Sequence, residues 1–563
     1  MRAWIARGVI LGALVAWGRV GGIAEANPDP LYTFFGDDWA TSAFGQALSG
    51  GCDINRDGVP DVVIAGGQER IADGHELVYV FSGRDWSLLY TLVQPNYDGY
   101  GSWDRKDDFG VSVDCRGDID ADGYADILVG ASFADEAGLN EGSAYVFSGR
   151  DGHLMHTITP SIPGSYHPGF FGWRVGFVKD VNGDRRDEVA IGAPAAEDRD
   201  ARRFYERGAV EVYTRGGDGR LRLLYRLVPP NDGIPLNKRY FGIAIAAGDA
   251  NGDGVSDFFI GAPGSAQYFG ERPGAVYGYS GRNGTLLSRF VAPTLGTRYG
   301  GSVDVADMNG DGYQDIVIGE SHYVPPGESE ETGRIEVRSG RTGSRLLEIE
   351  GGEEEYLGVS VVAEDISHSG RPNILATAAV ELGEDDAHVD LHIYSATGAL
   401  LGKLHGDSDS GFARALSHIG DLNRDKFQDF MISSLPWRRP PWGKVDLYKG
   451  TSGVGLSEPV PGIAGQDNTV TANAAEGATV VFVWGTDRVG RTRIPGCRGA
   501  WLDFTDPREA GRSVVVNGTA SFTRRVSDGL HGRTRRMQAF EIPAEGIQDS
   551  GCRVSNLVTF TFR

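Results

Sequence analysis

Sequence motifs that mark common enzymes are missing from this chain of 563 residues. It lacks a Gly-x-Ser-x-Gly nucleophile turn, a His-Glu-x-x-His zinc helix and a phosphate-binding P-loop. Cysteine is scarce, at four residues, and no histidine stands in a motif that would make one of them catalytic. These absences argue against the hydrolases, metalloproteases and nucleotide-binding enzymes that carry such motifs, and we expect no enzymatic activity.

Long apolar runs are also missing, except for one near the N-terminus. There, Arg2 and Arg7 are followed by an apolar run at residues 9–17 and by an Ala-x-Ala site that ends at Ala26. The run is shorter than the roughly 20 residues that a membrane-spanning helix needs, although an uncleaved anchor remains the alternative. We therefore expect a signal peptide at residues 1–26, no transmembrane anchor after its cleavage, and a protein secreted to the periplasm or cell surface.

Positive charge is in short supply. The chain has 54 Lys and Arg against 77 Asp and Glu, a formal net charge of -23, which argues against a nucleic-acid partner. Glycine, by contrast, is abundant at 83 residues. Without a Gly-X-Y period it excludes collagen and suits tight turns between short strands. The chain is too long for one ordinary core, so we expect several domains or a repeat array.

Acidic residues gather in a nine-residue loop that first occurs at residues 53–61, Asp-Ile-Asn-Arg-Asp-Gly-Val-Pro-Asp. Oxygen-bearing side chains fill positions 1, 3, 5 and 9, and such alternation can direct several oxygens at one hard cation. The loop recurs, intact or degraded, seven times at intervals of 56 to 69 residues, with first positions at Asp53, Asp118, Asp180, Asp249, Asp307, Asp365 and Asp421. A period of this kind indicates stacked supersecondary units.

Each unit around a loop follows the same pattern. An aromatic-Gly pair stands eight or nine residues before most of the loops, and a strand-like run and two further apolar runs follow each loop. Short β-rich runs separated by Gly, Asp and Asn turns, with no helical period, predict a four-stranded antiparallel meander. Seven such units predict an all-β chain with a seven-bladed β-propeller over residues 27–450.

The two ends of the repeat array predict how the ring closes. The seventh unit lacks its fourth apolar run after Gly450. Residues 31–35, Leu-Tyr-Thr-Phe-Phe, precede the first unit and resemble the fourth run at residues 89–93, Leu-Tyr-Thr-Leu-Val. We therefore expect the N-terminal segment to complete the seventh blade.

Two units carry a Phe-Gly pair before the loop and Gly-Ala-Pro after the strand that follows it. These are Phe171-Gly172 with Gly192-Ala193-Pro194, and Phe241-Gly242 with Gly261-Ala262-Pro263. With these residues the chain resembles the FG-GAP repeat family, whose repeat builds the propeller of integrin α subunits and occurs in many exported bacterial proteins. The resemblance covers roughly residues 31–450. It implies the propeller fold but little about activity, because one scaffold hosts many functions.

The resemblance also implies a cofactor, calcium, held by the side chains at loop positions 1, 3, 5 and 9 and by the backbone carbonyl of position 7. Carried onto this sequence, the implied ligands are Asp53, Asn55, Asp57, Val59 and Asp61; Asp118, Asp120, Asp122, Tyr124 and Asp126; Asp180, Asn182, Asp184, Arg186 and Glu188; Asp249, Asn251, Asp253, Val255 and Asp257; Asp307, Asn309, Asp311, Tyr313 and Asp315; and Asp421, Asn423, Asp425, Phe427 and Asp429.

Three loops depart from the pattern. The third has Arg185 at position 6 and the longer Glu188 at position 9, and the seventh has Lys426 at position 6 in place of Gly. The sixth offers Asp365, Ser367, Ser369 and Asn373. With one carboxylate left, we expect no calcium in the sixth loop.

Two alternatives compete with calcium-binding loops of this kind. An EF-hand needs a bidentate Glu at position 12, where these loops have apolar strand residues such as Ile64. Metal-free Asx turns are the other alternative. Three or four carboxylates crowded together would repel strongly without a cation, which favours calcium. We expect a structural metal, because coordination by protein oxygens leaves little room for a substrate.

Composition changes after Gly450. Residues 451–468 run through Gly, Ser and Pro and predict a linker, and residues 469–563 carry short β-rich runs that predict a small β-sandwich-like domain. In an exported protein we expect Cys497 and Cys552 to pair within this domain. Cys52 and Cys115 lie near the ends of the first strands of neighbouring blades and could form a second bridge, a question that the sequence leaves open.

These features favour an exported, calcium-stabilised binding or adhesion module. It would recognise an extracellular protein or glycan through the variable loops of the propeller, because loops on a rigid scaffold carry recognition. A polysaccharide-active enzyme and a passive envelope protein are the alternatives. The sequence names neither the ligand nor the propeller face that binds it, and it does not give the oligomeric state.

Overall fold

The computed structural model describes residues 30–36, 43–68, 76–95, 107–138, 140–162, 169–196, 207–234, 239–264, 273–380, 388–406, 412–435, 443–450, 467–473, 479–485, 489–493, 501–504, 508–514, 519–525, 534–542, 553–554 and 558–561. The regular elements among these residues are all β-strands. Within the same residues, no helix has the length and apolar character needed to cross a membrane. The predicted signal peptide lies outside them.

Six blades share one plan, in which four antiparallel strands pair in sequence order. The first two blades comprise β2 (Leu48–Cys52), β3 (Asp61–Gln68), β4 (Glu76–Phe81) and β5 (Leu88–Val93), then β6 (Phe109–Gly117), β7 (Asp126–Ala131), β8 (Ser143–Phe147) and β9 (Leu154–Ile158). The next two comprise β10 (Arg174–Val178), β11 (Glu188–Ala193), β12 (Ala209–Arg215) and β13 (Leu221–Leu227), then β14 (Ala244–Gly248), β15 (Asp257–Ala262), β16 (Ala275–Tyr279) and β17 (Leu286–Val291). The fifth and sixth comprise β18 (Ser302–Ala306), β19 (Asp315–Glu320), β20 (Arg334–Arg338) and β21 (Arg345–Glu350), then β22 (Leu357–Glu364), β23 (Asn373–Val380), β24 (His388–Tyr394) and β25 (Leu400–Leu404).

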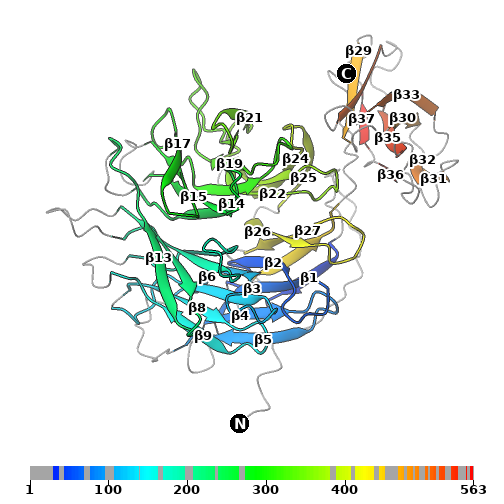
Figure 1. The fold of residues 1–563 in the computed structure, drawn as a ribbon. Helices are drawn as coiled ribbons and strands as arrows, with labels where there is room; N and C mark the ends of the chain where they lie inside the picture. Colours follow the sequence, from blue (N-terminus) through cyan, green and yellow to red (C-terminus); the bar gives the residue numbers. More distant parts are fainter. Residues whose placement is uncertain are drawn as a thin grey trace.

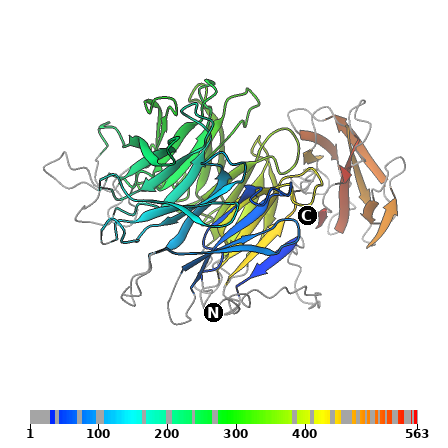
Figure 2. The same ribbon diagram turned by 60° about the horizontal axis from the view of Figure 1, so that its bottom comes forward.

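The seventh blade takes one strand from the start of the propeller. It comprises β26 (Phe412–Gly420), β27 (Asp429–Ser434), β28 (Lys444–Tyr448) and β1 (Tyr32–Phe35), with β1 at its edge. Phe34 pairs with Val445, and the hydroxyl of Thr33 donates a 2.7 Å hydrogen bond to Asp446. Figure 2 shows blue β1 beside the yellow strands of this blade. The prediction that residues 31–35 close the ring is confirmed.

The order of strands within a blade follows the distance from the ring axis. First strands such as β2 and β6 lie toward the middle of Figure 1, and fourth strands such as β5 and β9 lie at the rim. β2 lies against β6 on one side and β26 on the other. The second strands β7, β11, β15, β19 and β27 are buried along their whole length. This burial explains the continuous apolar runs that follow the loops in the sequence.

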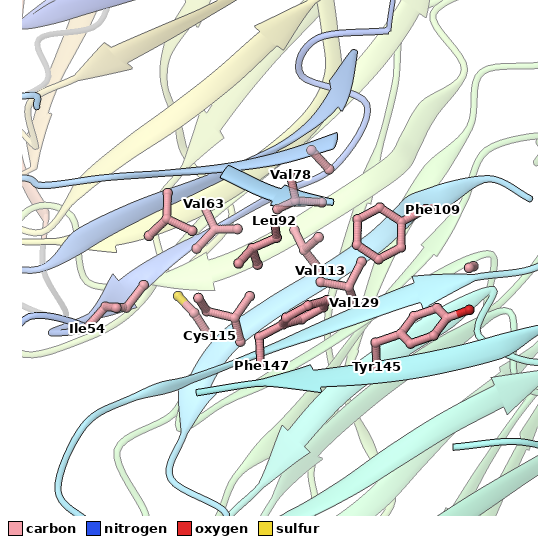
Figure 3. Packing of buried hydrophobic residues seen from close by; sticks show 14 of the residues in the cluster. Ile54, Val63, Val78, Leu92, Phe109, Val113, Cys115, Val129, Tyr145 and Phe147 are labelled. Atoms are coloured by element: carbon pink, nitrogen blue, oxygen red, sulfur yellow. The ribbon is translucent and has the colours of Figure 1, made fainter. Parts of the chain in front are cut away.

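The hydrophobic core is divided among the contacts between neighbouring blades. In one cluster Val63, Val78 and Leu92 of the first blade meet Val129 and Phe147 of the second (Figure 3). Equivalent clusters lie between the other pairs of neighbours, including the seventh and first blades. The ring is therefore stabilised by burial between blades, as expected of units that cannot bury their own faces.

A disulfide crosses the contact between the first and second blades. It joins Cys52 at the end of β2 to Cys115 in β6, with the two Cα atoms 5.8 Å apart. Both cysteines are buried. The structure therefore pairs Cys52 with Cys115, a pairing that the sequence left open. Cys497 and Cys552, which the sequence predicts to pair, lie outside the described residues.

The aromatic-Gly pairs pack one blade against the next. Phe171 forms a bridge with Gly142 of the preceding blade, and a Cβ on Gly142 would lie 2.1 Å from the Phe171 carbonyl oxygen. Gly208 approaches Phe241 of the following blade equally closely, at 2.2 Å. Both aromatic rings are buried. Glycine is required at these positions because any side chain would collide with the next blade.

The described residues of the C-terminal part all belong to strands. They are β29 (Asp467–Asn473), β30 (Thr479–Gly485), β31 (Val489–Arg493), β32 (Trp501–Phe504), β33 (Arg508–Val514), β34 (Thr519–Arg525), β35 (Thr534–Ile542), β36 (Arg553–Val554) and β37 (Val558–Thr561). β30 and β35 form the centre of one sheet, and β29 pairs with β34 in another. Phe482 of the first sheet stacks on Phe522 of the second, with ring centroids 5.8 Å apart. Two sheets joined by an apolar contact agree with the predicted β-sandwich-like domain.

Candidate metal centres

The six acidic loops occupy the same place in their blades. Each connects the first strand to the second, so that position 9 is the first residue of the second strand. These residues are Asp61 of β3, Asp126 of β7, Glu188 of β11, Asp257 of β15, Asp315 of β19 and Asp429 of β27. The apolar second strand anchors position 9 in the core, and the apolar residue at position 2, such as Ile54, is buried as well. Position 5 lies nearer the surface, where Asp122, Asp184 and Asp253 are exposed.

The side chains at positions 1, 3 and 5 fold back over their own loop. In the first loop Asp53 accepts hydrogen bonds of 2.9 Å from the backbone N–H groups of Asp57 and Gly58. Asn55 Oδ1 also accepts the Asp57 N–H at 2.9 Å, and Asp57 Oδ1 accepts the Val59 N–H. The other five loops repeat this pattern. Alternate side-chain oxygens are thereby collected on the inside of the loop.

The carboxylate at position 9 is buried beneath the others. Asp61 Oδ2 accepts the N–H of Ile54 at 2.8 Å, and its Oδ1 accepts the N–H of Gly83 at 3.0 Å. Burial raises the pKa of Asp61, Asp257, Asp315 and Asp429 to about 6 and that of Asp126 and Glu188 to about 7, against backbone N–H groups that lower it. A cation in contact with these groups would offset the cost of burying their charge.

Positions 4 and 6 both take the left-handed backbone conformation. Arg56 and Gly58 have φ of 59° and 78° in the first loop. Lys426 and Arg185, which replace the position-6 glycine in the seventh and third loops, keep the conformation with φ of 77° and 67°. The loop shape therefore survives the loss of glycine, at a cost of about 1 kcal/mol per residue.

The donor set suits a hard divalent cation. One carboxylate oxygen from each of Asp118, Asp120 and Asp126 lies within 4.8 Å of the other two, and Asp180, Asp184 and Glu188 form a second such group. The four remaining loops have Asn at position 3, whose amide oxygen takes the place of a carboxylate. All-oxygen donors at this spacing fit Ca²⁺ or Mg²⁺ better than a soft metal. The contribution of the position-7 carbonyls remains a prediction.

Two of the loops have an arginine bound to their position-5 aspartate, which the loop motif did not predict. Arg282, in the turn after β16, donates hydrogen bonds of 3.0 Å to the carboxylate and the backbone carbonyl of Asp253. Arg84, in the equivalent turn after β4, lies 3.4 Å from the Asp57 carboxylate. Both follow a Ser-Gly pair, a repeated motif that could have identified them. A guanidinium at position 5 reduces the repulsion among the acids of these two loops.

The sixth loop keeps the backbone shape of the others with a single acidic side chain, Asp365. Asp365 accepts the N–H groups of Ser369 and Gly370 at 2.9 and 2.7 Å, as position 1 does elsewhere. Asn373 takes the place of the buried carboxylate, and its side-chain oxygen lies buried without a hydrogen-bond partner. The loop conformation therefore follows from hydrogen bonding alone, and the acids of the other six loops go beyond what the shape requires.

Comparison with known families identifies the repeat. The FG-GAP repeat model matches residues 109–147, 171–210, 241–279 and 299–335. These segments are the first three strands and the loops of the second to fifth blades. Four of the seven blades are FG-GAP repeats. The two Phe-Gly pairs and Gly-Ala-Pro segments quoted above fall within the matched segments or at their starts.

The FG-GAP propeller is similar to integrin α subunits. It is 31% identical to integrin alpha-4 of Xenopus laevis over 252 residues, which is 43% of this chain and 22% of that protein. It is 32% identical to integrin alpha-V of Gallus gallus over 218 residues and 35% identical to integrin alpha-E of Homo sapiens over 199 residues, covering 19% and 16% of those proteins. The chain thus matches less than a quarter of the length of these relatives.

One solved structure resembles this chain weakly. Rhamnogalacturonan lyase YesW aligns over 72% of this chain and 71% of its own, with 15% sequence identity and a TM-score of 0.38. A likeness at this level carries no argument about activity.

Proposed function

We propose that this chain is a secreted recognition module, in which a calcium-stabilised propeller presents a binding surface to an extracellular protein or glycan. The observation that carries the proposal is the division of the ring into two unlike faces. One face bears short acidic loops and tight turns, and the other bears long and variable connections.

The antiparallel pairing of each blade produces this division. Loops between the first and second strands leave from the same face as turns between the third and fourth strands, which occupy residues 82–87, 148–153, 216–220, 280–285, 339–344 and 395–399. Second strands end and third strands begin at the opposite face, and the sequence between them comprises residues 69–75, 132–142, 194–208, 263–274, 321–333, 381–387 and 435–443. We assign recognition to this second face, because its connections vary most in length and sequence.

Calcium is the metal that best suits the first face. Six loops offer acidic and amide oxygens, and two of them bring three carboxylate oxygens within 4.8 Å of one another. Mg²⁺ demands a stricter octahedral geometry and releases its water reluctantly, so that loops with this many protein oxygens favour Ca²⁺. The metal would hold the first and second strands of a blade together, at a distance from the recognition face.

Export is supported by two features of the chain. The N-terminal sequence has the charged start, apolar run and Ala-x-Ala site of a signal peptide. The buried disulfide between Cys52 and Cys115 is of a kind that persists in oxidising compartments. The proposal assigns no catalytic role, since the clustered acids belong to the metal loops.

Binding to immobilised ligand arrays tests the recognition proposal. The mature protein in calcium buffer would be applied to glycan and extracellular-protein arrays, followed by affinity measurement on the strongest hit. Substitutions at two pairs of exposed residues, one pair on each face of the ring, then show which face binds the hit. Glu328 and Glu330 lie on the proposed recognition face, and Asn283 and Thr342 lie on the loop face.

We expect replacement of Glu328 and Glu330 by Lys to change the affinity for the hit, and replacement of Asn283 and Thr342 to leave it unchanged. The reverse result would move recognition to the metal face. Absence of any saturable ligand on both arrays would favour a passive structural protein instead.

A further inference from the structure

The ring encloses a polar channel on its axis. A cavity of about 410 Å³ is lined by the first strands of all seven blades, β2, β6, β10, β14, β18, β22 and β26. Its size falls within the range of small-molecule sites. The metal loops lie beyond the ends of these strands, and the recognition proposal above places its ligand on an outer face. Nothing assigned so far therefore uses the channel.

One guanidinium in the channel forms no ion pair with a described residue. Arg116 of β6 lies 2.7 Å from the buried carboxylate of Asp114 and 3.0 Å from the Nε2 of His418. Arg174 of β10 lines the same cavity, and no hydrogen bond or ion pair joins it to any other described residue. Water reaches its side chain, although the seven inner strands surround it. Burial and the nearby Arg116 charge lower the pKa of Arg174, and the charges of Asp114 and Asp304 oppose them.

Two carboxyl groups in the channel form no ion pair with a described Lys or Arg. Asp304 of β18 accepts hydrogen bonds from the backbone N–H groups of Ala363 at 2.8 Å and Val305 at 2.9 Å, and it has no ion pair with a described Lys or Arg. Glu364 at the end of β22 lies 3.6 Å from Nδ1 of His418. Burial lowers the pKa of His418 to about 4, so this imidazole is neutral at pH 7 and does not compensate Glu364.

Both acids feel the charge of the channel arginines, although neither forms an ion pair with one. Burial raises the pKa of Asp304, and the backbone N–H groups of Ala363 and Val305 and the charges of Arg116 and Arg174 oppose this rise. Burial and the neighbouring Asp304 charge raise the pKa of Glu364 to about 7. Among the described residues, the channel therefore holds a guanidinium on the third blade and carboxyl groups on the fifth and sixth blades that form no Lys or Arg ion pair, while the charges of Arg174 and Asp304 act on each other across the cavity.

We propose that the axial channel binds a small zwitterion that carries one carboxylate and one ammonium group, the charge pattern of a free amino acid. Its carboxylate contacts the guanidinium of Arg174, which presents a fork of donors suited to such a group. Its ammonium contacts Asp304 and Glu364. A simple anion would be repelled by these two acids, and a simple cation would be repelled by Arg174, so that a ligand with both charges fits the channel best.

Isothermal titration calorimetry on the full chain in calcium buffer tests this proposal. The probes are glycine, β-alanine, γ-aminobutyrate and a set of larger α-amino acids, compared with acetate, sulfate and ethylamine. We expect saturable binding of at least one zwitterion and no saturable binding of the probes with a single charge. Glycine, β-alanine and γ-aminobutyrate differ in the distance between their charges, so their relative affinities indicate the distance between Arg174 and the two acids.

Variants of the channel residues then locate the binding. R174Q and D304N should each weaken the affinity for the zwitterion by about tenfold or more, as expected for loss of a hydrogen bond to a charged group. R222Q removes one positive charge from an exposed residue of outer strand β13 and should leave binding unchanged. E364Q serves as a second acid variant in case D304N, which loses a contact between blades, does not fold.

Three outcomes would overturn the proposal. They are absence of saturable binding for every zwitterion, binding that R174Q and E364Q leave intact, and binding of acetate or sulfate alone with dependence on Arg174 only. The last result would indicate an anion site. The test does not depend on the outer-face ligand, so it can succeed or fail without affecting the recognition proposal.

Discussion

Gly83 donates its backbone N–H to Oδ1 of Asp61 across 3.0 Å, which joins the turn after the third strand of the first blade to the last residue of its acidic loop. The same bond recurs from Gly149, Gly281, Gly340 and Gly450 to position 9 of their own blades, at 2.9 to 3.2 Å. Position 9 therefore connects the first, second and third strands of a blade, and it stabilises the blade even before a metal is considered.

Replacement of Asp61 by Ala tests this connection. It leaves the N–H groups of Ile54, Asn55 and Gly83 without an acceptor in a buried site. We expect a loss of about 2–4 kcal/mol in the free energy of unfolding, measured by urea denaturation with a chelator present. Asp85→Ala, at an exposed turn of the same blade, should cost less than about 0.5 kcal/mol. Equal effects of the two variants would show that the buried network contributes nothing.

Removal of calcium should destabilise the propeller. We expect the melting temperature to fall by more than about 5 °C on addition of a chelator, since a site at 100-fold ligand excess contributes about 2.7 kcal/mol. Calcium should restore the original value, and magnesium at the same concentration should restore less of it. Elemental analysis after dialysis should find about six calcium ions per chain, one for each acidic loop. An unchanged melting temperature would contradict the metal proposal.

The sixth loop allows a gain-of-function experiment. Its backbone already has the loop shape, with Asp365 in place and left-handed φ at His368 and Gly370. The triple change Ser367→Asn, Ser369→Asp and Asn373→Asp should add one calcium ion per chain. It should lower stability in chelator, because added carboxylates repel one another, and recover it in calcium. No added calcium would show that the donor set alone is insufficient.

Loss of the bridge between the first two blades should weaken the ring. We expect the double variant Cys52→Ala/Cys115→Ala to lose about 2–4 kcal/mol in urea unfolding. The cysteines are separated by 63 residues, so the bridge restrains a long segment of the unfolded chain. The calcium content of the folded variant should stay the same. If stability is unchanged, packing of the first two blades is sufficient without the covalent bond.

A buried histidine should make the sixth blade sensitive to acid. Burial and the Lys403 charge lower the pKa of His392 from 6.5 to about 4. Between these two pH values the unfolded chain binds more protons than the folded chain. The contribution of neutral His392 to folding stability is therefore complete above pH 6.5 and is lost as the pH falls toward 4. We expect His392→Gln to reduce the loss of stability between pH 7 and pH 5 by about 1–2 kcal/mol, relative to the wild-type chain. Thr342→Ala, at an exposed turn and without a titratable group, should leave the pH dependence unchanged.

Repetition made most of the propeller predictable from sequence. The seven loops gave the number of blades, and the likeness of residues 31–35 to residues 89–93 gave the closure that β1 makes with β28. Both segments match the observed strands to within one residue at each end, since β1 is Tyr32–Phe35 and β5 is Leu88–Val93.

Features that depend on contacts between blades were not predictable. The channel charges Arg174, Asp304 and Glu364 belong to three different blades and stand at different distances from their loops. They share no motif, because only closure of the ring brings them to one cavity. The same holds for Cys52 and Cys115, whose pairing requires the separation between two first strands. The repeat pattern predicts the features that the blades share, whereas the charged side chains of the channel differ from blade to blade.

The pairing of β1 with β28 also constrains how the chain reaches its native state. The hydroxyl of Thr33 meets a residue 413 positions later in the sequence, a separation that makes the last blade slow to form. During synthesis, the segment with β1 must remain unpaired until nearly the whole propeller has left the ribosome. An exposed strand of this kind invites pairing with other chains, so the ring is most prone to misassembly just before it closes.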